Sequence, residues 1–345
     1  MGGAQYQAKV LIERIIETTD HDLHYLARRV PEYRTAKGHK IHKIGNSKGM
    51  NFIFDAKRLL QTLSKLAPDT IYCHVASAYV GISAWYAKTN GARLVWHFAS
   101  DIDVEPWSLG QRKNPPMSYL DKKIVEYGLR RADALIAQTD LQAQLLADNY
   151  GVNATEVIKN FHPRPTERLD KPTTKLKVAW VANLKAVKQP EQFLQLARRL
   201  DHLNAEFIML GGMQLSDDDR ESFERACERS ENVNYLGAVS QEVVNQHLAS
   251  AHLLVNTSVY EGFSNTFIQA WQRLAPVCSL NVDPDGLLTE LELGACAHGD
   301  EELLARQVEE LLLDSQRRER IANKAQDYAE THHSIGAADR LIKLL

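Results

Sequence analysis

The sequence lacks several features that would assign it to a specialised class of protein. No apolar run approaches the length of a membrane span, and we expect no secretory signal. No Gly-x-Gly-x-x-Gly follows a predicted strand, which disfavours a dinucleotide-dependent dehydrogenase. Cysteines are few and have no metal-ligand spacing, so we expect free thiols in a reducing cytoplasm at Cys73, Cys227, Cys278 and Cys296. There is also no short repeat and no low-complexity tract, as in an ordinary globular protein.

The chain has 345 residues, too many for one typical hydrophobic core and enough for two domains. Its net charge of −3 is divided unevenly. Residues 1–170 carry 23 Lys and Arg against 18 Asp and Glu, a net of +5, whereas the remainder has a net of −8. A basic first half fits an acidic partner such as an anionic membrane or a lipid-diphosphate acceptor, although ordinary scatter of charge produces the same asymmetry.

Short apolar runs alternate with segments of helical periodicity along the whole chain. We predict strands at 39–44, 70–75, 93–98, 132–137, 156–158, 176–182, 206–210, 233–236, 252–256 and from Pro276. We predict helices at 52–66, 78–89, 119–131, 141–150, 191–200, 217–229, 241–249, 301–313, 316–330 and 335–344, with another from Ser264. This alternation predicts an α/β fold with two parallel sheets, each covered by helices on both faces.

Three local signals add detail to these elements. An amphipathic helix is expected directly after Gly3, with four apolar residues on its inner side, Val10, Leu11, Ile15 and Ile16. Gly151 is expected to end the helix before it in the left-handed conformation. Residues 105–117 are predicted to be a loop, because their prolines interrupt a helix, and the length suggests an acceptor-side or membrane-side flap.

The segment from Ala251 to Leu280 holds the densest group of candidate functional residues. A predicted strand ends at Asn256, the following turn carries the carboxylate of Glu261, and Ser264 then provides an N-cap for a helix. A helix N-terminus attracts phosphate, so a diphosphate could be held by the backbone N–H groups of Ser264, Asn265 and Thr266. Glu261 would then lie beside the group that the diphosphate carries, and Gln269 would reach a ribose hydroxyl.

A simpler interpretation of the same segment is a packing unit. Phe263, Phe267 and Trp271 recur at helical spacing and are expected in the core. An isolated Glu before a helix is often only favourable for the helix dipole.

This segment resembles the donor-binding signature of retaining GT-B glycosyltransferases, which has a Glu, seven residues and a second Glu. In that family the first Glu contacts the donor sugar and the second contacts the nucleotide ribose. Here the first is Glu261, whereas position 269 is Gln, which keeps a hydrogen-bonding group but removes a charge. The resemblance covers nearly the whole chain and is strongest over residues 176–280.

The resemblance implies a fold of two Rossmann-like, doubly wound parallel-sheet domains that face each other across a cleft. We expect an N-terminal acceptor-side domain at 1–164, a linker at 165–174 and a donor-binding domain at 175–330. Residues 331–345 would form a C-terminal helix that crosses back to the first domain.

The resemblance also implies donor contacts in the second half of the chain. Lys188 stands where family members have a Lys on the donor diphosphate, and Asn183 stands where they have an Arg, so a bidentate phosphate contact is lost. Lys185 is a candidate substitute, or a plain surface lysine. Gly211 belongs to a turn at which the backbone can approach a ligand. The region of Gly237 flanks the nucleotide base in the family.

In the first half, the candidates are His97 and the glycine pair Gly2 and Gly3. His97 ends a predicted strand, where open α/β sheets place ligands, so it would contact the donor sugar or the acceptor. A core histidine bonded to backbone is an equal alternative. The two glycines match a loop that follows the first strand in the family. We therefore expect about 10–20 upstream residues with one apolar strand in the working enzyme.

The expected function is a cytoplasmic, nucleotide-sugar-dependent glycosyltransferase that acts with retention on a glycan or lipid-linked glycan for surface polysaccharide. Peripheral contact with an anionic membrane is expected, and contact with nucleic acid is not. No metal or other cofactor is expected, because lysine and helix dipoles would stabilise the leaving diphosphate. Asp101 and Asp103 form an Asp-x-Asp pattern of the kind that binds metal ions, but it lies in the acceptor half of the chain and is interpreted as coincidence.

Two alternatives keep the same fold. A catalytically weak partner subunit is suggested by Asn183, Gln269 and the expected lack of a first strand. A nucleotide-sugar epimerase would instead release an altered sugar without an acceptor.

Overall fold

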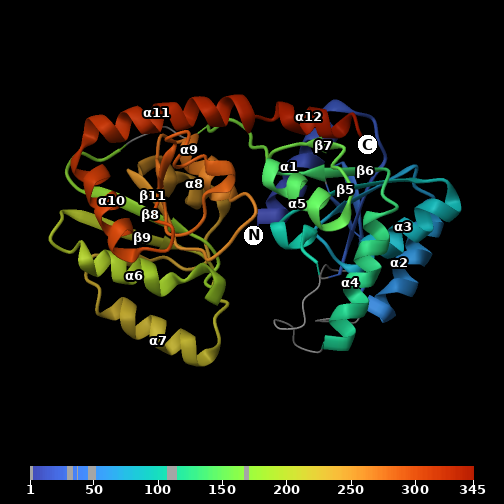
Figure 1. Cartoon of the computed structure of the whole chain (residues 1–345), viewed down its shortest axis with the longest axis horizontal. Helices are drawn as coiled ribbons and strands as arrows, with labels where there is room; N and C mark the ends of the chain where they lie inside the picture. The colour runs from blue at the N-terminus through green and yellow to red at the C-terminus, as the bar shows by residue number, and fades with distance from the viewer. Residues whose placement is uncertain (1–2, 29–33, 37, 46–51, 107–114, 167–170) are drawn as a thin grey trace. The chain divides into compact units, whose positions relative to one another are not determined.

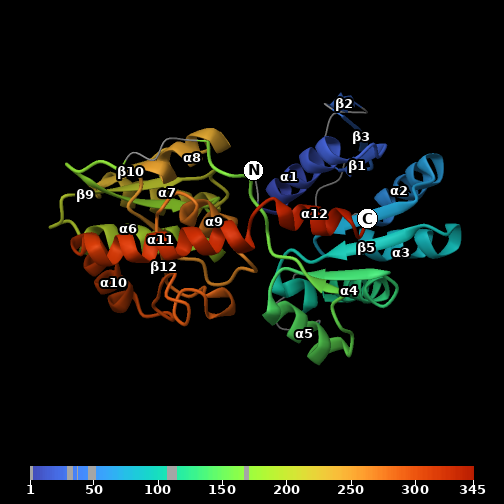
Figure 2. The ribbon, with the colours of Figure 1, turned by 90° about the horizontal axis from the view of Figure 1, so that it is seen from above.

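The computed structural model describes residues 3–28, 34–36, 38–45, 52–106, 115–166 and 171–345. These residues form two compact units. The C-terminal unit contains His162–Ile335 and Gly3, and the N-terminal unit contains Ala4–Phe161 and Gly336–Leu345. Each unit is built from helices and mainly parallel strands, so the predicted α/β class is confirmed (Figure 1, Figure 2).

The C-terminal unit has one six-stranded parallel sheet in the order β10-β9-β8-β11-β12-β13. Its strands are β8 (Leu176–Val181), β9 (Ala205–Leu210), β10 (Val233–Tyr235), β11 (Leu253–Asn256), β12 (Val277–Ser279) and β13 (Gly294–Cys296). The order runs one way from β8 to β10 and the other way from β11 to β13. The carboxyl ends of β8 and β11 therefore flank the point at which ligands bind in open α/β sheets.

Helices cover both faces of this sheet (Figure 1). Val178 and Trp180 of β8 pack in one buried cluster, whereas Ala179 between them packs in the other, as expected for a strand buried on both sides. The first cluster takes side chains mainly from α6 (Pro190–Arg199), α7 (Asp217–Glu228) and α10 (Glu301–Leu313). The second takes them mainly from α8 (Gln241–Ser250), α9 (Asn265–Trp271) and α11 (Ser315–His332).

The described residues of the N-terminal unit form two sheets instead of the single sheet that the sequence predicts. One has the order β1-β3-β2 and contains β1 (Leu23–Ala27), β2 (Arg34–Ala36) and β3 (His39–Lys43). The other has the order β4-β5-β6-β7 and contains β4 (Thr70–His74), β5 (Arg93–His97), β6 (Ala134–Ala137) and β7 (Glu156–Val157). The pairings are parallel except that β2 runs antiparallel to β3.

Six α-helices belong to the described part of this unit: α1 (Gly3–Thr18), α2 (Phe52–Leu66), α3 (Ala78–Asn90), α4 (Pro115–Leu129), α5 (Asp140–Tyr150) and α12 (Gly336–Ile342). A bidentate ion pair attaches the last helix to the first. Nε and Nη2 of Arg14 donate to the two carboxylate oxygens of Asp339 at 2.7 and 2.9 Å. The end of the chain is thereby packed into the same unit as its beginning.

Several predictions about single elements were wrong. The strands β1, β2 and β13 were missed, because they are short and contain polar or small residues in place of an apolar run. Pro115 and Pro116 do not interrupt a helix but begin α4, since a first turn needs no N–H donor. Ile16, expected on the inner side of α1, is 37% exposed. The predicted loop at 105–117 otherwise lies mostly outside the described residues.

Other predictions are confirmed. Gly151 has a φ of 62° and its N–H donates to the carbonyl of Ala147, as a C-terminal helix cap should. The four cysteines are free thiols. In the described part of the chain, no helix is long and apolar enough to cross a membrane.

Candidate active site

The candidate site of the C-terminal unit is formed by two loops, which follow β8 and β11 at their carboxyl ends. The first loop contains a short 3₁₀ helix at Ala186–Lys188. The second runs from Thr257 to Phe263, and the N–H of Val259 donates to the carbonyl of Val187 at 2.9 Å, which ties the two loops together. Residues far apart in the sequence thus meet where a ligand is expected.

Glu261 and Lys188 form the charged centre of this site. The ammonium Nζ of Lys188 lies 3.0 Å from Oε1 of Glu261, and their side chains are 21% and 16% exposed. The same oxygen accepts hydrogen bonds from Asn256 Nδ2 at 2.8 Å and from Ser258 Oγ at 2.7 Å. All three contacts reach Oε1, so Oε2 is the oxygen that can accept from a ligand hydroxyl.

Asn256 holds Glu261 in a defined orientation. Its Oδ1 accepts from the backbone N–H of Ser258 at 3.1 Å, which fixes the amide so that Nδ2 faces the carboxylate. Nδ2 also lies 3.2 Å from the Ser258 hydroxyl. Asn256 is 6% exposed and Ser258 is 1% exposed, so this network is shielded from competing water.

Thr257 holds the backbone of the loop that carries Lys188. Its hydroxyl accepts from Nε1 of Trp180 at 2.9 Å and points toward the carbonyls of Lys188 and Gln189 at 2.7 and 3.0 Å. Thr257 and Trp180 are buried. The three consecutive residues Asn256, Thr257 and Ser258 therefore hold the carboxylate of Glu261 and the backbone of Lys188. The sequence interpretation missed this role, although polar residues after a buried strand were a usable signal.

Asn183 does not point freely toward a ligand. Its Oδ1 accepts from the backbone N–H of Gly212 at 3.3 Å, which ties the loop after β8 to the turn after β9. In that turn Gly211 has a φ of 155°, and a Cβ there would lie 1.6 Å from the carbonyl oxygen of Ala182, so only glycine fits. The N–H of Gly211 donates to Gly237, whose own φ is 68°. Lys185 is exposed at the surface of the same region.

The helix α9 begins after the second loop, with Ser264 as its N-cap. The Ser264 and Thr266 hydroxyls lie 2.9 Å apart, and Ser264 makes no side-chain cap to the backbone. Asn265 Oδ1 contacts the Nε2 of His162 at 3.0 Å. Gln269 is 4% exposed, so its amide is nearly enclosed. Helix geometry leaves the first backbone N–H groups without intrahelical acceptors.

The apolar side of α9 has the core role expected for it. Phe263 is 5% exposed, and Phe267 and Trp271 are fully buried. Their rings pack edge to face or tilted against one another.

His97 lies in the N-terminal unit and is buried at 1% exposure. Nδ1 contacts the Tyr72 hydroxyl at 3.0 Å, and Nε2 contacts the carbonyl of Ile158 at 3.3 Å. Burial, with the neighbouring His74 second, lowers its pKa well below the usual value, so the ring is neutral. Both nitrogens are engaged, as in the alternative of a core histidine. Of the glycine pair, Gly2 lies outside the described residues and Gly3 is the first residue of α1.

Two family models match the sequence and together span nearly all of it. A model described as Glycosyltransferase Family 4 matches residues 1–162, and one described as Glycosyl transferases group 1 matches residues 164–328. No curated protein gives a significant match.

The fold is similar to that of several solved glycosyltransferase structures. Sucrose-phosphate synthase from Thermosynechococcus elongatus has 14% identity and a TM-score of 0.79, with 100% of this chain and 92% of that chain covered. Anabaena HepE in complex with UDP-glucose has 16% identity and a TM-score of 0.78, with 100% and 95% covered. WaaG, a glycosyltransferase involved in lipopolysaccharide biosynthesis, has 14% identity and a TM-score of 0.77, with 100% and 96% covered. At such identities the likeness shows the fold alone. The two family models, which together span residues 1–162 and 164–328, show that the chain belongs to the glycosyltransferases, and the structural likeness shows that its fold is GT-B.

Proposed function

We propose that this enzyme transfers a sugar, with retention, from a nucleoside diphosphate to a hydroxyl of a glycan or lipid-linked glycan in surface polysaccharide synthesis. The observation that carries the proposal is the contact of Lys188 with Glu261 at 3.0 Å, beside the carboxyl ends of β8 and β11. A cation for the diphosphate and a carboxylate for the sugar are thus held next to each other. HepE, solved with UDP-glucose, supports UDP-sugars as the first donors to test.

In this mechanism the bond between the anomeric carbon and the diphosphate oxygen breaks, and the acceptor oxygen bonds to the same carbon. Lys188 Nζ stabilises the charge that develops on the diphosphate, helped by the N-terminus of α9 at Ser264–Thr266. Glu261 accepts a sugar hydroxyl through Oε2 while Oε1 stays on its three donors. Retention places the acceptor on the face that the diphosphate leaves, so a diphosphate oxygen takes the acceptor proton.

The remaining donor contacts follow from the loop geometry. Because Asn183 is engaged with Gly212, we assign the second diphosphate cation to the exposed Lys185. Gly211 and Gly237 line the nucleotide side, and Gln269 bonds the ribose. His97 would contact the acceptor or sugar only by exchanging its contacts with Tyr72 and Ile158. No metal or cofactor takes part in this scheme.

The proposed domains are an acceptor-side domain at 1–164, a linker at 165–174, a donor-binding domain at 175–330 and a returning helix at 331–345. The grouping of Gly336–Leu345 with Ala4–Phe161 supports the last assignment.

We also assign the enzyme to the cytoplasm, with peripheral contact to the inner face of the plasma membrane. The net charge of +5 over residues 1–170 supports this, as does the exposure of Lys57 and Arg58 on α2. Lys40, which is paired with Asp22, and Lys43 would also take part. The other two lysines that we expect to face the membrane, Lys37 and Lys48, lie outside the described residues. Binding should require acidic lipid and weaken with salt, and equal binding to neutral liposomes would contradict it.

The test of the function is product analysis with a panel of nucleotide sugars and glycan acceptors. We expect a glycoside whose anomeric configuration is that of the donor. An inverted product would refute retention, and a free altered sugar formed without an acceptor would identify an epimerase. Donor binding without any turnover would favour the partner-subunit alternative, which the residues Asn183 and Gln269 support.

A further inference from the structure

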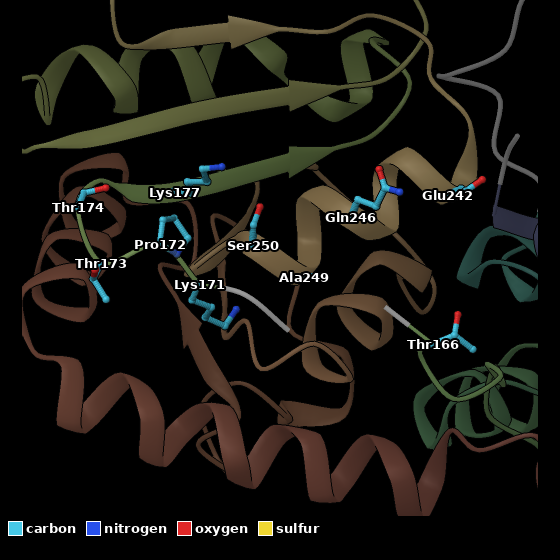
Figure 3. Close-up of a pocket in the computed structure, with 10 residues that line it drawn as sticks. All are labelled: Thr166, Lys171, Pro172, Thr173, Thr174, Lys177, Glu242, Gln246, Ala249 and Ser250. Carbon is cyan, nitrogen blue, oxygen red and sulfur yellow. The ribbon is translucent and has the colours of Figure 1, made fainter. Parts of the chain in front are cut away.

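A cavity of about 970 Å³ lies in the C-terminal unit, apart from the candidate active site (Figure 3). It is bounded by the segment before β8, by the start of that strand and by α8. Its lining is polar and consists of Thr166, Lys171, Pro172, Thr173, Thr174, Lys177, Glu242, Gln246, Ala249 and Ser250. Lys177 belongs to the amino end of β8, whereas Glu261 follows the carboxyl end of β11. Because these neighbouring strands are parallel, the two sites lie at opposite ends of the strands.

Hydrogen bonds fix the wall that carries the lysines. Lys171 Nζ donates to the carbonyl of Ala251. The His252 ring accepts from the N–H of Lys177 at 3.0 Å through Nδ1 and bonds to the carbonyl of Pro172. Asn204 Nδ2 donates to the carbonyl of Thr174 at 2.7 Å. These hydrogen bonds give the wall of the cavity a defined structure.

This wall has an excess of positive charge. Burial first, and then the cation of Arg318, lowers the pKa of Lys171 to about 7. Burial, with Arg318, Lys171 and Lys177 next, lowers the pKa of His252 to about 4. In the part of the chain that the structure describes, no carboxylate lies within 4.0 Å of Nζ of Lys171 or Lys177. Among the described residues, the other charged or titratable groups around this wall are Glu242, His247 with Glu206 near it, and Asp314 and Glu319 near Arg318.

We propose that this cavity binds a phosphate group, free or as the monoester of a small sugar, between Lys171 and Lys177. Two ammonium groups match a doubly charged oxyanion, and hydroxyl and amide groups from Thr173, Thr174 and Gln246 supply further hydrogen bonds. The site does not depend on the proposed glycosyl transfer, because it shares no residue with the donor site.

Binding is coupled to protonation of Lys171. In the empty site its amine is charged below pH 7 and largely neutral above it, and a bound oxyanion favours the charged form. His252 stays neutral in this range, because its Nδ1 accepts a backbone N–H. Anion affinity should therefore fall up to about tenfold from pH 6 to pH 8, with uptake of nearly one proton at pH 8.

The experiment uses the full chain and calorimetric titration in chloride of matched ionic strength. Inorganic sulfate is the first probe, because its own charge does not change between pH 6 and pH 8. Inorganic phosphate and a hexose phosphate are then compared at one pH, and tighter binding of the ester identifies the sugar phosphate as the occupant. The variants are Lys171→Met, Lys177→Met and Lys171→Arg. Lys175→Met is the control, because that exposed lysine lies outside the lining.

We expect saturable binding that Lys171→Met and Lys177→Met abolish and Lys175→Met leaves unchanged. In Lys171→Arg, binding should persist without its dependence on pH, because arginine stays charged. Absence of saturable binding by all three probes, or equal binding in Lys171→Met, would overturn the proposal. UDP-glucose titrated in parallel should bind Lys171→Met and the unmodified enzyme equally. A failed donor titration with intact sulfate binding would count against the proposed function and not against this site.

Discussion

Asn256 provides a direct test of how Glu261 is held. In Asn256→Ala, Glu261 loses the donor at 2.8 Å, and the backbone N–H of Ser258 loses its acceptor at 3.1 Å. A hydrogen bond to a charged group contributes about 1.5–3 kcal/mol. Because Asn256 sits behind Oε1 and does not face the ligand, most of this loss should appear as misplacement of Glu261. We expect kcat/KM to fall by about 10- to 100-fold, with kcat affected more than KM.

Asn256→Asp gives a sharper result, because it keeps the shape and replaces the donor by a second carboxyl group. Two carboxyl groups in contact cannot both ionise without a large penalty, so the pair keeps a proton to higher pH than a lone carboxyl. With that proton present, an O–H donates to Glu261 as the amide did. Above the pKa of the pair both groups are negative and repel. Relative to the unmodified enzyme, this variant should therefore lose activity as the pH rises.

The assay is initial-rate turnover of a donor across pH 5.5 to 8.5, with thermal unfolding measured on the same samples. Asn232→Asp is the matched control, because its Nδ2 donates to the carbonyl of Ala197 at 2.7 Å at the amino end of β10, far from Glu261. It should affect stability but not the shape of the pH profile. If Asn256→Asp has the same pH profile as the unmodified enzyme, or Asn256→Ala retains full kcat/KM, the positioning argument fails.

Four further predictions follow from the same geometry. Glu261→Ala should lower turnover by at least ~10²-fold with little change in the unfolding temperature, and near-normal turnover would remove Glu261 from the mechanism. Gln269→Glu should be tolerated, whereas Gln269→Leu should raise the donor KM by a factor that corresponds to a loss of about 1–2 kcal/mol of binding free energy. An unchanged KM in the Leu variant would favour a packing role. Removal of divalent metal by EDTA should leave turnover unchanged, and loss that Mg²⁺ restores would refute the metal-free scheme. Burial lowers the pKa of His74 and of His162 to about 4, so between about pH 6.5 and pH 4 the unfolded chain binds more protons than the folded chain. The free energy of unfolding should therefore fall as the pH is lowered through this window, and a free energy that stays constant there would contradict the prediction.

The long, strongly patterned elements were predictable from sequence. The apolar run of β8 and the helices α2 and α10 were placed within one residue, because burial on both faces or an amphipathic stripe leaves a clear pattern. The strands β1 and β2 were not, since both are short and their sequences, LHYLA and RTA, contain no continuous apolar run. Whether such a segment forms a strand depends on its pairing with a neighbouring strand, and the hydrophobic periodicity of a single sequence does not reveal that pairing.

The candidate site shows the same division. Glu261 and Lys188 were both expected to be functional, but their contact depends on β8 and β11 being neighbours, which the 71 residues between these strands do not reveal. Asn256 and Ser258 were missed because their role depends on which oxygen of Glu261 they reach. For Asn183, the sequence predicted the loss of a phosphate contact but could not predict its contact with the turn at Gly212.

The most direct test of the central claim is the thermal stabilisation of the enzyme by a panel of nucleotide sugars, with and without Lys188→Met. A ligand at 100 times its Kd stabilises a protein by about 2.7 kcal/mol, which is measurable as a shift in Tm. At least one nucleotide sugar should raise the Tm of the unmodified enzyme, and Lys188→Met should remove most of that shift while leaving the ligand-free Tm nearly unchanged. No stabilisation by any donor, or an equal shift in Lys188→Met, would contradict the account.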